Sequence, residues 1–394
     1  MQSPPHFLAL ESTDPLKLCE PLTARHDDPV NYNPPPGLKE AVDVAMMLGE
    51  PIVLTGAPGA GKTQAAKWLA HHLNANEVLR FDVKSTTLGA DLLYAFDDVA
   101  RFRDAAAGRT PQFDVKPLVR YLRFNALGYG IVRAAGPNSV LWTVGGEELK
   151  GGDVIQRHRK LLDDAFGPGW QPTGDEVRVC DLFPDDADFR QPFRGREVRV
   201  VLIDELDKAP RDTPNDLLVE VENMTFLIAE LGLRVKTDRK VRPIVVITSN
   251  AEKPLPEPFL RRCAYFDVPR VRGETLKAIL QGSLKGRSVS ENLINEVVEV
   301  ADLLHSSQDA IHRKPGTAEL LAWSEVLARL GAGSGLKAWG RKQRDQLAQS
   351  LTALLKQADD QRAGLDMITK WMEGARGRPR EARGAALPDS PSWR

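Results

Sequence analysis

The sequence predicts an α/β protein in which a parallel sheet flanked by helices is followed by a helical domain. Between residue 51 and about residue 270, short β-branched runs alternate with segments of helical spacing. That alternation is typical of a parallel sheet that is covered on both faces. After about residue 272 we expect no further strand, because apolar residues recur every three or four positions, as in a helical bundle.

The composition is that of an ordinary globular chain. Of its 394 residues, 42% are hydrophobic and 27% charged, and the net charge of -1 gives no support for nucleic-acid or membrane binding. No apolar run approaches the roughly 18–20 residues of a membrane span, and no signal peptide is recognised. Cys19, Cys180 and Cys263 form neither a disulfide framework nor a zinc set. We therefore expect a cytoplasmic protein.

The pattern along the chain predicts four parts. Residues 1–36 are rich in proline and suggest an extended arm. Residues 37–271 form the α/β domain, interrupted at about 136–195 by a stretch rich in Gly, Pro and Asp that predicts an irregular insertion. Residues 272–373 form the helical domain, and residues 374–394 are expected to be a disordered tail.

The loop after the first predicted strand has the residues of a phosphate-binding turn. The stretch GAPGAGKT fits G-x-x-x-x-G-K-[ST] between a strand and a helix. Glycine lets backbone N–H groups approach a pyrophosphate, and the following helix N-terminus attracts the same anion. A turn that uses glycine only for tightness needs no Lys-Thr pair. The predicted nucleotide-binding residues are Gly56, Ala57, Pro58, Gly59, Ala60, Gly61, Lys62, which would reach the β- and γ-phosphates, and Thr63, whose hydroxyl would bind Mg²⁺.

A second predicted strand supplies carboxylates for the same site. The run VRVVLIDELDK ends its apolar part at Asp204 and Glu205. We expect Asp204 to join Thr63 in holding Mg²⁺, and Glu205 to orient and deprotonate the attacking water. The chain lacks the N/T-K-x-D element usual in guanine-specific proteins, so ATP is favoured over GTP.

Three further positions are candidates for the site. Asn250 ends the run RPIVVITSN and, on a strand between the two motif strands, can bond the attacking water or the γ-phosphate. Arg261 and Arg262 follow a short helix and suggest a finger inserted into a neighbouring subunit's site. Arg313 and Lys314 precede another helix, and either can contact phosphate. The competing interpretations are a turn-forming asparagine and solvated basic side chains.

In this order the motifs resemble those of the AAA+ ATPases, most closely the MoxR branch and the related dynein-like group that includes CbbQ-type activases and McrB. The likeness covers roughly residues 38–330. GAPGAGKT resembles Walker A, VLIDELDK resembles Walker B, and TSN resembles sensor 1. LPEPFLRRC resembles the arginine-finger stretch, in which Arg262 aligns better than Arg261. The MoxR pattern has an arginine after the proline where this chain has Gly316, so Arg313 is the remaining candidate for sensor 2.

The resemblance implies a P-loop NTPase core with a C-terminal helical lid, ATP and Mg²⁺ as ligands, and an oligomeric ring, commonly a hexamer. It also implies a protein substrate that is remodelled or activated, and a possible von Willebrand factor A-domain partner. Two alternatives stay open. A nucleic-acid-linked motor, as in McrB, predicts hydrolysis stimulated by DNA or RNA, and a signalling switch predicts slow hydrolysis.

Overall fold

The chain divides into two compact units. The computed structural model describes residues 29–75, 78–107, 117–185, 199–237, 241–285, 289–307, 309–340 and 343–376. One unit spans Pro34–Pro269, and the other joins Met1–Asn33 to Arg270–Arg394. The division therefore falls close to the boundary expected after residue 271. Most of the predicted arm and of the predicted tail lies outside the described residues.

The first unit is built on a five-stranded parallel sheet, as the sequence predicts. Its strand order is β10-β1-β9-β6-β2. The central strands β1, β9 and β6 are almost wholly buried, whereas the edge strands alternate between half-buried and exposed residues. Burial on both faces explains the continuous apolar runs of the central strands. The strands are β1 (Ile52–Thr55), β2 (Leu79–Asp82), β6 (Val200–Asp204), β9 (Ile244–Thr248) and β10 (Ala264–Asp267).

Helices pack against this sheet and connect its parallel strands, so the carboxyl ends of all five strands lie at the same edge of the sheet. Helix α3 contacts β6 and β9, and α5 contacts β2 and β6. Two glycines let α5 approach closely, because a Cβ at Gly128 would lie 1.9 Å from the Leu93 carbonyl oxygen and one at Gly130 would lie 2.6 Å from Val201. The helices are α2 (Leu38–Leu48), α3 (Lys62–His72), α5 (Ala126–Ala135), α9 (Thr213–Asp216), α10 (Leu218–Asn223) and α11 (Glu257–Leu260), with the 3-10 turn η6 (Leu206–Lys208).

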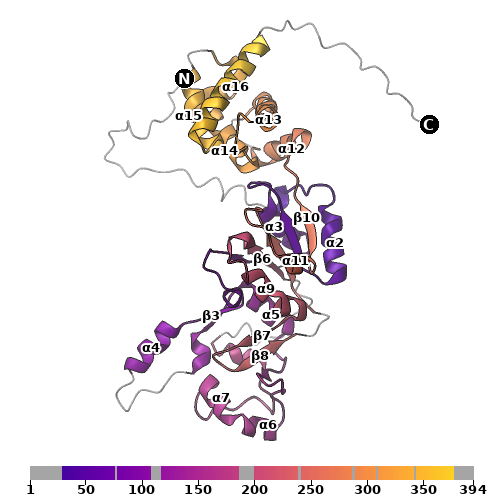
Figure 1. The fold of residues 1–394 in the computed structure, drawn as a ribbon, viewed down its shortest axis with the longest axis vertical. Coiled ribbons are helices and arrows are strands. Elements are labelled where there is room, and N and C mark those ends of the chain that lie inside the picture. The colour runs from indigo at the N-terminus through magenta and orange to yellow at the C-terminus, as the bar shows by residue number, and fades with distance from the viewer. Residues whose placement is uncertain are drawn as a thin grey trace, which may run out of the picture. The chain divides into compact units, whose positions relative to one another are not determined.

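Two small antiparallel sheets extend the first unit. The pair β3 (Tyr94–Phe96) and β4 (Leu122–Phe124) carries α4 (Asp98–Ala107), which points away from the main sheet in Figure 1. The second sheet has the order β5-β8-β7, and its strand β8 packs on α5. Its strands are β5 (Trp142–Thr143), β7 (Thr225–Ile228) and β8 (Leu233–Lys236), and 3-10 turns occur at η3 (Gly89–Leu92), η4 (Leu118–Tyr121) and η5 (Val179–Leu182).

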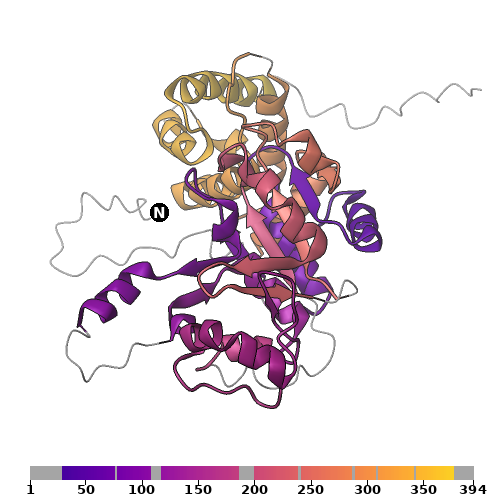
Figure 2. The ribbon, with the colours of Figure 1, turned by 60° about the horizontal axis from the view of Figure 1, so that its bottom comes forward.

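The expectation of an irregular insertion at 136–195 is corrected for its described part, residues 136–185. This part contains β5 and two short helices, α6 (Gly152–Arg157) and α7 (Arg159–Phe166). In α7, Leu162, Ala165 and Phe166 are buried together at helical spacing. The helices lie on the side of the small sheet that faces away from the main sheet (Figures 1 and 2). Short helices flanked by glycines give too few turns for their periodicity to stand out in the sequence.

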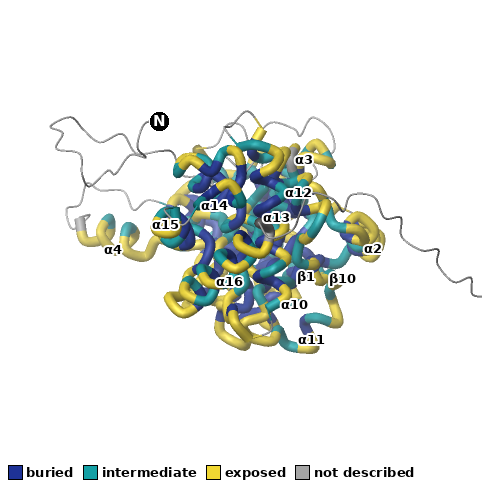
Figure 3. Tube along the Cα trace, turned by 90° about the horizontal axis from the view of Figure 1, so that it is seen from above, coloured by how far each residue is buried: buried dark blue, intermediate teal, exposed yellow. Residues whose placement is uncertain are grey.

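Every regular element described in the second unit is helical. Trp323 is fully buried, and its indole N–H donates to the Ser350 hydroxyl at 2.9 Å. Figure 3 shows α14 as one of its most buried elements. The expected bundle is therefore present, whereas its role as a lid stays a prediction. The helices are α12 (Gly273–Ser283), α13 (Glu291–Ser306), α14 (Thr317–Leu327), α15 (Arg344–Leu354) and α16 (Ala358–Arg376), with the shorter turns η2 (Pro29–Asn31), η7 (Ala328–Ala332) and η8 (Leu336–Ala338).

A buried carboxylate fixes the loop before α14. Asp360 accepts the backbone N–H groups of His312 at 2.8 Å and of Arg313 at 3.0 Å. Burial alone would raise the pKa of Asp360, but these hydrogen bonds and the His312 ring outweigh it and hold the pKa below its usual value. The Lys314 ammonium donates to the carbonyls of His305 and Ser307, both at 2.7 Å, and so closes the end of α13.

Replacing Asp360 with alanine should lower the free energy of unfolding by about 2–3 kcal/mol, because two backbone donors lose their acceptor. Urea unfolding of the full chain, followed by circular dichroism, measures the change. Asp359→Ala is the control, since that side chain is 85% exposed. The folded pKa of Asp360 is lowered, so its contribution is present above the unfolded value of 3.8 and is lost as the pH falls through the folded pKa. Equal losses of unfolding free energy in Asp360→Ala and Asp359→Ala would contradict the role given to Asp360.

Candidate functional site

The glycine-rich loop after β1 has a backbone that requires glycine at its ends. Gly56, Gly59 and Gly61 have φ values of 134°, 75° and 91°, a region that other residues rarely adopt. A Cβ on Gly56 would also lie 2.6 Å from the Val268 carbonyl oxygen. Helix α3 begins at Lys62, so the N–H groups of its first turn have no partner within the helix and can bind an anion at the loop. The loop is completed by Ala57, Pro58 and Ala60.

Lys62 is folded over this loop. Its side chain is buried, and its ammonium donates to the carbonyls of Gly56 at 2.7 Å and Ala57 at 3.0 Å. Burial lowers the pKa of Lys62. Nearby carboxylates oppose that shift, namely those of Asp207, Asp204, Glu205 and Asp267. The lysine therefore lies near a group of acids at the carboxyl-terminal ends of β6 and β10.

The two predicted metal ligands lie together. Asp204 is the last residue of β6 and is 5% exposed. The Thr63 hydroxyl, in the first turn of α3, lies 3.1 and 3.2 Å from its two carboxylate oxygens. Hydroxyl and carboxylate oxygens are ligands that suit Mg²⁺, which usually keeps several waters and phosphate oxygens as its other ligands. The residues present thus fit a magnesium ion at this point.

Strand β9 lies between β1 and β6, the position that the sequence predicts for the strand before Asn250. Its last residue, Thr248, is 1% exposed and was not predicted as part of the site. The Thr248 hydroxyl donates to Asp204 at 2.5 Å and accepts the backbone N–H of Glu205 at 2.8 Å. Thr248 therefore joins β9 to both acidic residues of β6. In the sequence, the signal for Thr248 is that it is a polar residue at the end of an apolar run.

Glu205 is held in an uncommon conformation next to Asn250. Its φ of 61° is left-handed, which costs a residue with a side chain of order 1–3 kcal/mol and occurs most often at functional sites. One carboxylate oxygen accepts the Asn250 amide at 3.1 Å, and the other is ion-paired with Lys208. The hydrogen bond from Lys208 lowers the pKa of Glu205 most, burial opposes it, and Asn250 lowers it further. Glu205 is thus an ionised, half-exposed carboxylate.

Asp207 supports the turn after β9 and was also missed. It is 4% exposed, and one oxygen accepts the backbone N–H groups of Asn250 at 3.2 Å and Glu252 at 3.0 Å. Ala251 between them has a φ of 57°, so the turn needs this support. Because both donors follow β9, the bonds depend on how β6 and β9 lie side by side. In the sequence, only the acidic character of DELDK indicates a role for Asp207.

The arginine candidates do not lie with these residues. Arg261 pairs with Glu257 at 2.5 Å and Arg262 with Glu222 at 3.5 Å, and their side chains are 75% and 51% exposed. Both precede β10, whose first residue pairs with Ile52, the first residue of β1. The loop follows the other end of β1, about 13 Å further along the strand. Both arginines therefore lie at the amino-terminal edge of the sheet.

Arg313 belongs to the second unit. Its backbone is held by Asp360 and its side chain is exposed. Lys314, the other candidate there, is engaged with the end of α13, as described above. Of these two side chains, only that of Lys314 bonds to the carbonyls at the end of α13.

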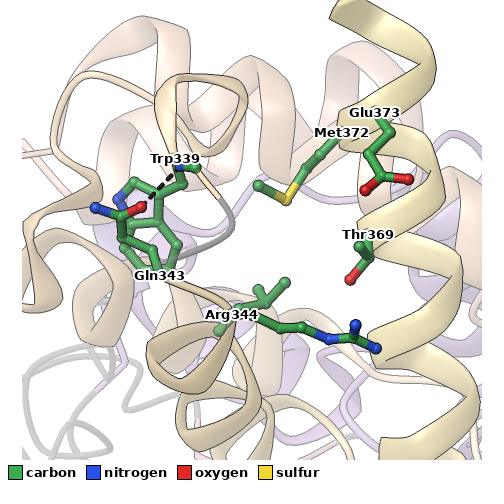
Figure 4. Close-up of a pocket in the computed structure, with 8 residues that line it drawn as sticks. Trp339, Gln343, Arg344, Thr369, Met372 and Glu373 are labelled. Atoms are coloured by element: carbon green, nitrogen blue, oxygen red, sulfur yellow. Dashed lines mark hydrogen bonds between the residues drawn. The ribbon is translucent and has the colours of Figure 1, made fainter.

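A separate pocket of about 280 Å³ lies in the second unit, beside α15 and α16 (Figure 4). Met372 and Thr369 face it from α16, and Arg344 borders it from α15. The Gln343 side chain accepts the backbone N–H of Gly340 at 2.8 Å, which uses its carbonyl oxygen within the fold. The pocket has no element in common with the glycine-rich loop.

Comparison with known proteins adds little to this geometry. No protein-family model and no curated protein matches the chain. Among solved structures, it is similar to the RuvB Holliday junction branch migration motor of Thermotoga maritima, at 12% identity and a TM-score of 0.30. The match covers 86% of this chain and 66% of that one, just under two thirds of its length. At that TM-score the likeness does not bear on the site. Within the described ranges, no helix has both the length and the apolar character needed to cross a membrane.

Thr248→Val should lower the free energy of unfolding by about 1–3 kcal/mol, because the Glu205 N–H is left buried without an acceptor. Denaturant unfolding measures the loss. Thr248→Ser keeps the hydroxyl and should recover most of it. Because valine keeps the methyl group and loses only the hydroxyl, a Thr248→Val variant as stable as the wild type would contradict the role given to the two hydrogen bonds.

Proposed function

We propose that this chain binds and hydrolyses ATP at the carboxyl-terminal edge of its parallel sheet, as an AAA+-type ATPase of the MoxR kind. The observation that supports it most is the meeting of Thr63 with Asp204, beside Lys62. A glycine-rich turn, a helix N-terminus and a buried lysine form a site for phosphate, and the adjacent carboxylate completes a site for its metal ion. The turn, the lysine and the helix N-terminus belong to one continuous segment, Gly56–Thr63, whereas Asp204 comes from the end of β6.

Hydrolysis assigns a separate task to each residue. Lys62 would leave the loop carbonyls and donate to the β- and γ-phosphates, while Thr63 and Asp204 hold Mg²⁺. The ion would neutralise charge on the phosphates. Glu205 would accept a proton from the attacking water once its pair with Lys208 opens, because Lys208 otherwise occupies the oxygen that a water must reach. Asn250 would keep the Glu205 carboxylate in place through its amide.

The active form would be an oligomeric ring. The support is the position of Arg261 and Arg262, which lie at the edge of the sheet opposite the loop of their own chain. Their exposed side chains can reach a site on a neighbouring copy, where an arginine stabilises charge on the transferred phosphate. The motif resemblance adds the proposals of a hexamer, a sensor-2 role for Arg313, and a protein substrate or von Willebrand factor A-domain partner.

Lys62→Ala should abolish ATP binding, because the phosphates lose their buried cation. Isothermal titration calorimetry of the purified chain with ATP and Mg²⁺ measures the affinity. Lys67→Ala, five residues further along α3, is the matched control and should bind normally. Wild-type affinity in Lys62→Ala would place any nucleotide site elsewhere.

Mixing two inactive variants tests the proposed finger. Arg262→Ala should bind ATP without hydrolysing it, and Glu205→Gln should do the same for lack of a base. Mixed subunits should recover part of the ATPase rate, because a site with an intact Glu205 then meets a neighbour with an intact Arg262. The same mixture made with Arg261→Ala identifies which arginine acts. Absence of rescue with both arginine variants would argue against a site shared between subunits.

A further inference from the structure

An arginine outside all the motifs contacts the carboxylate proposed to hold the metal. Arg80 lies on the edge strand β2, which pairs with β6 so that Asp82 is opposite Asp204. One guanidinium nitrogen of Arg80 lies 2.9 Å from the Asp204 oxygen Oδ2. The same oxygen is 3.2 Å from the Thr63 hydroxyl. Arg80 thus occupies part of the space next to the proposed metal ligands.

Arg80 supplies the charge that Asp204 needs when no metal is bound. A carboxylate that is only 5% exposed is costly to bury without a cation or several hydrogen bonds. The Thr63 and Thr248 hydroxyls supply hydrogen bonds but no charge. The ammonium of Lys62 is directed to the loop carbonyls of Gly56 and Ala57 instead.

Arg80 also has a second acceptor that does not involve Asp204. Its Nε and one terminal nitrogen lie 2.8 and 2.6 Å from the same Asp82 oxygen. The Arg80 side chain is 43% exposed and that of Asp82 is 67% exposed, so the guanidinium can turn away from the site without being buried or unpaired. A cation held by Thr63 and Asp204 would repel the guanidinium in its present position.

We propose that Arg80 is a placeholder for the metal at Asp204. It neutralises the carboxylate in the ligand-free protein and keeps only its contact with Asp82 when Mg²⁺ arrives with the nucleotide. Competition between the two cations then sets the Mg²⁺ concentration at which nucleotide is held. This inference rests on the proposed function and deepens it, because it assigns a determinant of metal affinity to a residue that takes no part in hydrolysis itself.

The test is a Mg²⁺ titration of the full-length chain with a fluorescent, non-hydrolysable ATP analogue at fixed concentration. Arg80→Met should lower the half-saturating Mg²⁺ concentration about threefold, the scale expected for a partly exposed ion pair. The melting temperature of ligand-free Arg80→Met should fall, while the rise produced by Mg²⁺ and analogue should exceed that of the wild type. Arg80→Lys retains a cation and should stay close to the wild type.

Asp82→Asn gives an independent test with the opposite sign. It removes the negative charge of the alternative partner and thereby weakens that contact, so Arg80 should hold Asp204 more firmly and the half-saturating Mg²⁺ concentration should rise. Arg123→Met, the same substitution on β4, is the matched control and should change neither value. An unchanged or raised Mg²⁺ requirement in Arg80→Met, or a lowered one in Asp82→Asn, would overturn the proposal. If the wild type bound the analogue without regard to Mg²⁺ and Lys62→Ala bound it equally well, the proposed function itself would fail.

Discussion

The arrangement of the site depends on one buried carboxylate. Asp204 is contacted by the hydroxyl of Thr63 from α3, the hydroxyl of Thr248 from β9 and the guanidinium of Arg80 from β2. These contacts join the glycine-rich loop to three strands of the sheet at a single point. A buried charge is tolerated only where such partners surround it, so the requirement to satisfy Asp204 also fixes the groups that would face a nucleotide.

In the ligand-free protein, three basic side chains of the candidate site have partners within the chain. Lys62 bonds to carbonyls of its own loop, Arg80 pairs with Asp204, and Lys208 pairs with Glu205. Binding of a metal and a nucleotide would replace the first two contacts, and hydrolysis would require the third to open. The energy of the replaced contacts would reduce the net affinity, and it would make the change between the two states depend on nucleotide and metal together.

The sequence indicates the local parts of the candidate site, whereas the parts that depend on strand register leave no local pattern. The loop at Gly56–Thr63 could be recognised because its backbone needs glycine at fixed positions, and Asp204 because it ends an apolar run. Thr248 and Arg80 act across strands that are far apart in the chain. Their alignment with Asp204 follows from the strand order β10-β1-β9-β6-β2, which no local pattern specifies. The helices within 136–185 were missed because each spans at most about two turns.

The central claim is that a triphosphate and its metal ion are held between the loop after β1 and Asp204. A crystal structure of the chain with a non-hydrolysable ATP analogue and Mg²⁺ tests it most directly. The account predicts phosphate density against Gly56–Thr63, the Lys62 ammonium turned from the loop carbonyls to that phosphate, and the metal next to Thr63 and Asp204. Analogue bound elsewhere, with Lys62 still bonded to Gly56 and Ala57, would contradict it.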